Sequence, residues 1–190
     1  FISRLGEKAL PLYRLLRRTD NFEWTDAATA GLEEIKALLA SNPILAAPNA
    51  GEPMLLYISA THQVVSAVLV VEREQDGHKF PLQKPVYYVS TVLTPCKSRY
   101  PHYQKIAYAV FMASRKLRHY FQECSITVAS EVPLNDIINN RDATGRIAKW
   151  AIELLPFDIT YKPRRAIKSQ VLADFVAEWT EAELPKEYGA

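Results

Sequence analysis

The sequence predicts an α/β protein in which helices cover both faces of a five-stranded mixed sheet, with two further helices ahead of the sheet. Three short segments rich in β-branched residues follow one another, and strands then alternate with helical segments. The 190-residue chain is 48% hydrophobic and has only six glycines. It therefore carries enough apolar material to bury a core.

The first 45 residues predict helices over residues 2–18 and 26–41. In the second, Thr25 is a candidate N-cap and Asp26 favours the positive end of the helix. Asn42-Pro43 ends this helix, and the stretch AAPNAGEP is typical of a linker. We therefore expect a helical segment over residues 1–45, a domain over 46–180 and an acidic tail over 181–190.

The remaining elements follow from residue period and turn signals. The longest helix, over residues 101–121, carries an apolar stripe that includes Ile106, Val110 and Leu117. Strands are predicted over residues 53–59, 64–73, 84–90, 125–130 and 157–163. Further helices are predicted over residues 132–138, 144–155 and 169–179.

Composition excludes several classes of function. Cys96 and Cys124 have no metal-binding or redox spacing, and the four histidines are scattered. We therefore expect no metal site and no cofactor. The sequence shows no membrane span and no signal peptide, so we expect a protein that is cytoplasmic or nuclear and not secreted. The net charge of +2 divides into −4 from Val171 onward and +6 before it, which permits an acidic or nucleic-acid partner.

Several segments, in order, resemble the polyprotein of plant gypsy-class LTR retrotransposons, in its reverse transcriptase connection and RNase H-like region. The resemblance implies an RNase H-like fold, with residues 1–45 from the polymerase thumb or connection. It also implies flanking polymerase, RNase H and integrase domains, and a virus-like particle as the cytoplasmic location. The matching segments are FEWTDAATAGLEEIKALLASNPIL, LLYISATHQVVSAVLV, KPVYYVSTVLT, RYPHYQKIAYAVFMASRKLRHYF and ATGRIAKWAIELLPFDITYKPRRAIKSQVLADFVAEW.

The resemblance also implies where a nuclease site would lie. An RNase H site needs about four carboxylates around two Mg²⁺ ions. The family positions fall at Ser59, Ile106, Glu131 (or Ser130 with a one-residue shift) and Asp174. No acidic residue lies in the stretches 55–71 or 77–122, so the first strand and the long helix offer no ligand. Glu131 and Asp174 are the vestigial pair that remains.

We therefore expect a catalytically degenerate connection or tether domain, of the kind that some plant gypsy-class lineages carry before a second, intact RNase H. One alternative is a weakly active RNase H that uses Mg²⁺ with Asp174, Glu131 and an acid recruited from residues 72–76. Another is a domesticated protein-interaction module. Glu131 could also serve only to stabilise the start of the following helix.

Two basic groups are candidates for weak contact with an RNA–DNA hybrid or a template–primer duplex. Such groups bind phosphates with little sequence preference. Bases at a helix end also offset the negative helix terminus, which is the simpler explanation for the first group. The first group is Arg115, Lys116 and Arg118, and the second is Lys162, Arg164, Arg165 and Lys168.

Overall fold

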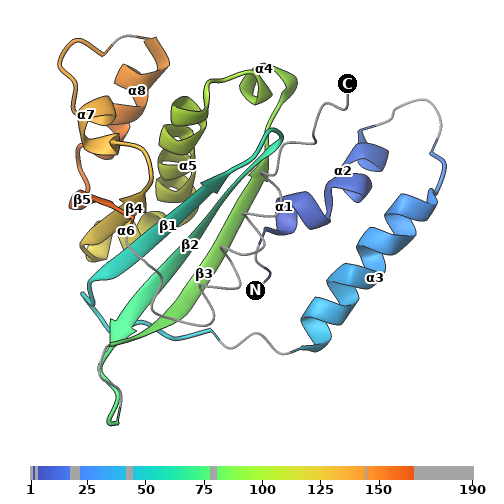
Figure 1. The fold of residues 1–190 in the computed structure, drawn as a ribbon, viewed down its shortest axis with the longest axis horizontal. Helices are drawn as coiled ribbons and strands as arrows, with labels where there is room; N and C mark the ends of the chain where they lie inside the picture. Colours follow the sequence, from blue (N-terminus) through green and yellow to red (C-terminus); the bar gives the residue numbers. More distant parts are fainter. Residues whose placement is uncertain are drawn as a thin grey trace, which may run out of the picture.

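The fold is a five-stranded mixed sheet with helices on both faces, as the sequence predicts (Figure 1). The sheet order is β3-β2-β1-β4-β5. The strands are β1 (Met54–Ala60), β2 (Val64–Arg73), β3 (Leu82–Val92), β4 (Ile126–Ser130) and β5 (Ile159–Pro163). The structure, a computed structural model, describes residues 2, 4–17, 22–41, 45–77, 81–143 and 145–164. The helix expected over residues 169–179 and the tail 181–190 lie outside the described residues.

Strand pairing follows from the connections. β1, β2 and β3 pair antiparallel because short hairpins join them, whereas β4 and β5 each return through helices and pair parallel. The register sets Met54 opposite Val71 and Tyr57 opposite Ala129. The carboxyl ends of β1 and β4 therefore meet at one edge of the sheet.

One face of the sheet carries the main core. Alternate residues of β1, including Leu56 and Ile58, pack against the long helix α5 (His102–Lys116). Figure 1 shows α7 (Leu134–Ile138) and α8 (Gly145–Leu154) on the same side as α5. The single helix predicted over residues 101–121 is wrong in one respect, because Leu117 leaves helical geometry and α6 (Arg118–Glu123) turns away. This turn brings Phe121 into the core. A short helix, α4 (Pro95–Ser98), precedes α5.

The N-terminal helices cover the other face. The helix predicted over residues 2–18 is in fact two, α1 (Leu5–Lys8) and α2 (Leu10–Leu16). The physical reason is Pro11, which has no N–H to continue the hydrogen bonding of α1. Gly6 of α1 touches the sheet: its N–H donates to Ser90 Oγ at 2.7 Å, and a Cβ there would lie 3.0 Å from Val64 Cγ1.

Helix α3 (Asp26–Ala40) begins where the sequence predicts. Thr25 is its N-cap, and the Thr25 hydroxyl accepts a hydrogen bond from the Ala28 N–H at 3.3 Å. α3 packs on α1 and α2 through Ala28 and Gly31, which are buried. No helix in the described part of the chain is long and apolar enough to cross a membrane.

The linker predicted at AAPNAGEP is hydrogen-bonded to the sheet. Arg73 of β2 donates to both carboxylate oxygens of Glu52, at 2.9 and 2.8 Å, and to the carbonyl of Ala47 at 2.6 Å. The Ala46 N–H donates to the Pro85 carbonyl on the edge strand β3. Hydrogen bonding from Arg73 lowers the pKa of Glu52 from 4.5 to about 2. Residues 46–52 therefore cover one end of β2 and β3.

Candidate site at the carboxyl ends of the central strands

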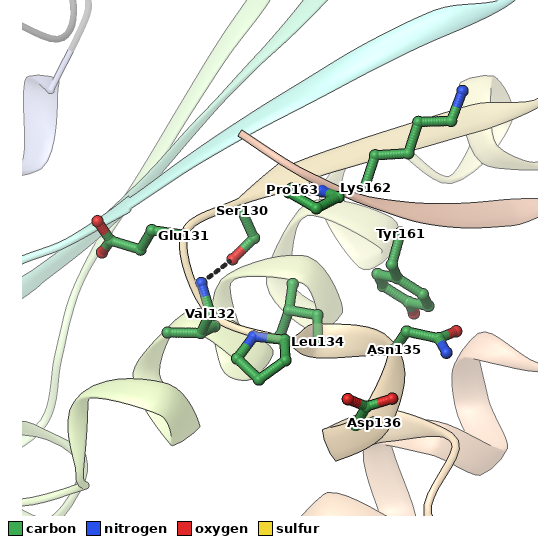
Figure 2. Close-up of a pocket in the computed structure, with 10 residues that line it drawn as sticks. Ser130, Glu131, Val132, Leu134, Asn135, Asp136, Tyr161, Lys162 and Pro163 are labelled. Carbon is green, nitrogen blue, oxygen red and sulfur yellow. Dashed lines mark hydrogen bonds between the residues drawn. The ribbon is translucent and has the colours of Figure 1, made fainter. Parts of the chain in front are cut away.

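Glu131 follows β4 directly, at the edge where β1 and β4 both end. The chain turns sharply there, because Ser130 Oγ accepts a hydrogen bond from the Val132 N–H at 3.1 Å. Glu131 is exposed, and Figure 2 shows its carboxylate directed away from the neighbouring hollow. Its Oε1 lies 2.9 Å from Nε2 of His102, the first residue of α5. The carboxylate predicted for the third family position is thus paired with a histidine.

Ser59 and Ile106, at which the sequence resemblance predicts the first two ligand positions, are buried and uncharged. Ile106 is 1% exposed and lies in the core cluster with Ile58 and Ala60. Ser59 is 2% exposed and, by the alternation of a strand, faces the opposite side of the sheet, where it is paired with Ser66 of β2. Ile106 therefore packs on the face of the sheet that α5 covers, whereas the Ser59 side chain projects from the opposite face. Burial of Ile106 is what its place on the apolar stripe predicts.

A lysine that sequence reasoning missed lies beside these positions. Lys105 is 7% exposed, and its ammonium donates to the carbonyls of Thr61 (3.4 Å) and His62 (3.2 Å) in the β1–β2 turn. Burial lowers the pKa of Lys105. A cationic group therefore joins the start of α5 to the end of β1, and a divalent cation nearby would be repelled by it. Nothing in the sequence marks this contact, because it depends on how α5 packs.

The structure contradicts the recruitment of an acid from residues 72–76. Val71 of β2 lies opposite Met54, the first residue of β1, and Glu72 is the next residue beyond Val71. Glu131 lies beyond Ser130, level with the end of β1. The two acids are about six residues apart along β1, or roughly 20 Å at about 3.3 Å per residue. No group of three metal-ligating side chains occurs in the described residues, and Asp174 lies outside them.

A hollow of about 310 Å³ lies between the β4–α7 turn and β5 (Figure 2). Val132, Leu134 and Tyr161 give it an apolar lining, and Asn135 and Asp136 supply polar groups. Burial raises the pKa of the Tyr161 hydroxyl to about 12. With Glu131 directed away, the hollow holds one carboxylate, so it suits an apolar group better than a metal ion.

The first predicted basic group is divided: Arg115 and Arg118 line one hollow together with Glu153, and Lys116 lies apart from them. Arg115 binds Glu153 of α8, with its Nε 3.1 Å from Oε2, and its guanidinium lies 4.8 Å from the centre of the Phe111 ring. Lys116 instead donates to the Ser90 carbonyl on β3 at 2.9 Å. The adjacent side chains therefore leave α5 in different directions, while Arg118 is exposed on α6.

The second predicted basic group is described only in part. Lys162 is exposed on β5, and Arg164, which is half-buried, follows that strand. Arg165 and Lys168 lie outside the described residues. Whether these four side chains form one surface stays a prediction.

The sheet order, with the main helix between β3 and β4, defines an RNase H-like α/β fold. A family model described as "RNase H-like domain found in reverse transcriptase" matches residues 24–128, more than half of the chain. The chain therefore belongs to this family of reverse transcriptase-associated RNase H-like domains.

The relatives are larger proteins, and this chain spans less than a third of the length of those described next. The Transposon Tf2-3 polyprotein of Schizosaccharomyces pombe is 26% identical over 179 residues, covering 87% of this chain and 13% of the polyprotein. The foamy viral protease-reverse transcriptase dRH in complex with dsDNA has a TM-score of 0.67 at 21% identity, covering 88% of this chain and 30% of that one. The foamy viral protease-reverse transcriptase in complex with RNA/DNA hybrid has a TM-score of 0.66 at 22% identity, covering 88% and 23%.

Proposed function

We propose that this chain is a catalytically inactive connection or tether domain in the reverse transcriptase of a plant gypsy-class LTR retrotransposon. The observation that carries the proposal is Ile106, which fills the helix position of a metal ligand and is 1% exposed in the core. The ammonium of the adjacent Lys105, bound to carbonyls of the β1–β2 turn, adds positive charge at the end of β1 that would disfavour a divalent metal nearby. Both features favour a fold that has lost its nuclease site.

The second part of the proposal is that the domain helps to hold an RNA–DNA hybrid or template–primer duplex. Support comes from the structural relatives, which are reverse transcriptases in complex with dsDNA and RNA/DNA hybrid, and from the charge of +6 before Val171. A charge of this size gives weak, salt-dependent contact with phosphates.

The third part concerns neighbours and location. Because the S. pombe relative is a polyprotein of which this chain matches 13%, we propose flanking polymerase, RNase H and integrase domains. Residues 1–45 would come from the thumb or connection, ahead of an RNase H-like domain over 46–180 and an acidic tail over 181–190. The polyprotein would act in a cytoplasmic virus-like particle or in the nucleus.

Binding and cleavage measured on the same sample test the proposal. The chain is mixed with an end-labelled RNA–DNA hybrid and Mg²⁺, binding is followed by anisotropy across a salt series, and the RNA is then analysed on a gel. We expect salt-dependent binding with intact RNA. Metal-dependent cleavage would contradict the proposed inactivity. Absence of any salt-dependent binding would contradict the hybrid-holding role and favour a protein-interaction module.

A further inference from the structure

Positive charge gathers on one stretch of the chain to a degree that the net charge conceals. Residues 81–122 contain seven lysines and arginines and no aspartate or glutamate. This stretch runs from β3 through α4 and α5 into α6. The whole chain has a net charge of only +2, so this stretch is far more basic than the chain average.

Two cations, Lys97 of this stretch and Arg146 of α8, lie on aromatic rings between α4, α5 and α8. The guanidinium of Arg146 lies 4.1 Å from the centre of the Tyr100 ring, and it donates to Gln104 of α5 at 3.0 Å. The Lys97 ammonium lies 4.5 Å from the Tyr108 ring centre and 2.9 Å from its hydroxyl. Cation–π contacts of this kind hold a charge in place without neutralising it.

The rings themselves form one connected cluster. Trp150 of α8 lies 6.2 Å from Tyr100, 5.6 Å from Tyr108 and 5.9 Å from Phe111, measured between ring centres. This packing joins α8 to α5, which lie side by side in Figure 1. The cations bound to these rings are therefore held at fixed positions relative to one another.

Helical spacing extends the same surface along α8. Arg146, Lys149 and Glu153 are three and four residues apart, so they share one side of the helix. At the far end, Glu153 is already paired with Arg115. Lys149, in the middle of α8, is exposed. Arg99, which ends α4 and precedes Tyr100, is exposed too. We call Lys97, Arg99, Arg146 and Lys149 the α5–α8 cationic surface.

Within the described part of the chain, the four members of this surface have no carboxylate partner. Two nearby acids are engaged elsewhere, Glu153 by Arg115 and Glu131 by His102, while Asp142, just before α8, is exposed. Four positive charges without a carboxylate partner, two of them held on aromatic rings, suit a ligand with closely spaced negative charges. Duplex nucleic acid has this property, with about one charge per 1.7 Å of its axis.

We infer that the α5–α8 cationic surface is where this domain contacts the phosphate backbone of an RNA–DNA hybrid. The inference rests on the proposed hybrid-holding role and moves its main contact away from Arg115 and Lys116. Those two side chains are held by Glu153 and by the Ser90 carbonyl. An acidic polypeptide is the competing ligand, and the surface fits it less well because its charges are flexible and more widely spaced.

The test is a triple variant, Arg99→Gln, Arg146→Gln and Lys149→Gln. A matched control carries Arg14→Gln, Arg17→Gln and Lys36→Gln on α2 and α3. Both sets remove three exposed charges, and each includes one arginine that donates to a glutamine at 3.0 Å. The control differs in that Lys36 is also paired with Glu33 at 2.8 Å. Binding of the 190-residue chain to a labelled hybrid is measured by anisotropy across a salt series.

We expect the triple variant to lower affinity at least about tenfold at about 0.1 M salt and to reduce the salt slope by about 2 to 3. The matched control should change both far less. The double variant Arg99→Gln with Lys149→Gln disturbs no hydrogen bond in the described residues. It should reduce the salt slope by about two thirds of the reduction seen in the triple variant. Thermal unfolding checks that each variant is folded.

Three results would overturn the inference while leaving the proposed function intact. The first is equal loss in the triple variant and the matched control, and the second is no loss in either. The third is a larger loss from Arg115→Gln, Lys116→Gln and Arg118→Gln. Equally tight binding of poly-glutamate would overturn nucleic acid as the ligand. No binding of the hybrid by the wild-type chain would instead contradict the proposed function itself.

Discussion

Replacing Ile106 by glutamate supplies the carboxylate that the helix lacks, and we predict that it unfolds the domain rather than creating a metal site. Ile106 is 1% exposed and packs in the cluster of Ile58 and Ala60. The change forfeits about 1.5–3 kcal/mol of apolar burial. A buried glutamate also has its pKa raised to about 8–9, from about 4.3 in the unfolded chain.

The charge effect depends on pH in a defined direction. Because the folded-state pKa is raised, the folded variant binds more protons, and its stability falls as the pH rises above about 4.3. At about pH 8 the added loss is about 5 kcal/mol, from nearly four pKa units at about 1.4 kcal/mol each. Together with the lost burial this approaches the whole stability of a typical domain, about 5–15 kcal/mol.

Urea unfolding measures this prediction. The Ile106→Glu variant is compared with Ile106→Gln, which has nearly the same shape and no charge. We expect similar stabilities at about pH 4 and a large deficit for the glutamate variant at about pH 8. A glutamate variant as stable as the glutamine variant at both pH values would refute the reasoning, because residue 106 would then be hydrated.

Three further predictions concern the frame around the site. Gly6→Ala should cost about 1–3 kcal/mol in urea unfolding, because its Cβ would lie 3.0 Å from Val64 Cγ1; no change would show that α1 is not seated on the sheet. Thr25→Ala should cost about 0.5–2 kcal/mol and speed amide exchange in the first turn of α3; unchanged exchange would contradict the cap. The stability that Glu52 adds through Arg73 should be complete above about pH 4.5 and be lost as the pH falls through about 2, because the folded-state pKa of Glu52 is lowered. Glu52→Gln should therefore flatten the acid limb of the stability curve, and an unaltered limb would argue against this contact.

Much of the fold could be predicted because local signals and tertiary structure agree. β2 has the predicted bounds, 64–73, since an apolar β-branched run lies between two turns. The break before α2 was also encoded, in Pro11, and α4 in the pair Thr94-Pro95. The end of α5 at Leu117 has no comparable marker, because neither proline nor glycine occurs there.

The missing carboxylates of the candidate site could be predicted from the sequence, whereas the contacts of Lys105 and Arg115 could not. The absence of acids and the burial of Ile106 follow from counting residues and from helical period. The contacts of Lys105 with the β1–β2 turn join residues more than 40 positions apart. The same holds for Arg115, which meets Glu153 only because α8 packs on α5. Sequence patterns report local period, whereas these contacts depend on packing.

The most direct test of the central claim is cleavage of a labelled RNA–DNA hybrid by the wild-type chain, first with Mg²⁺ and then with Mn²⁺. Asp174→Asn and Glu131→Gln variants serve as controls, since these are the two carboxylates that the sequence resemblance predicts at family positions. The account predicts no product above background from any of the three proteins with either metal. Cleavage by the wild-type chain that Asp174→Asn abolishes would show that a metal-dependent nuclease site persists.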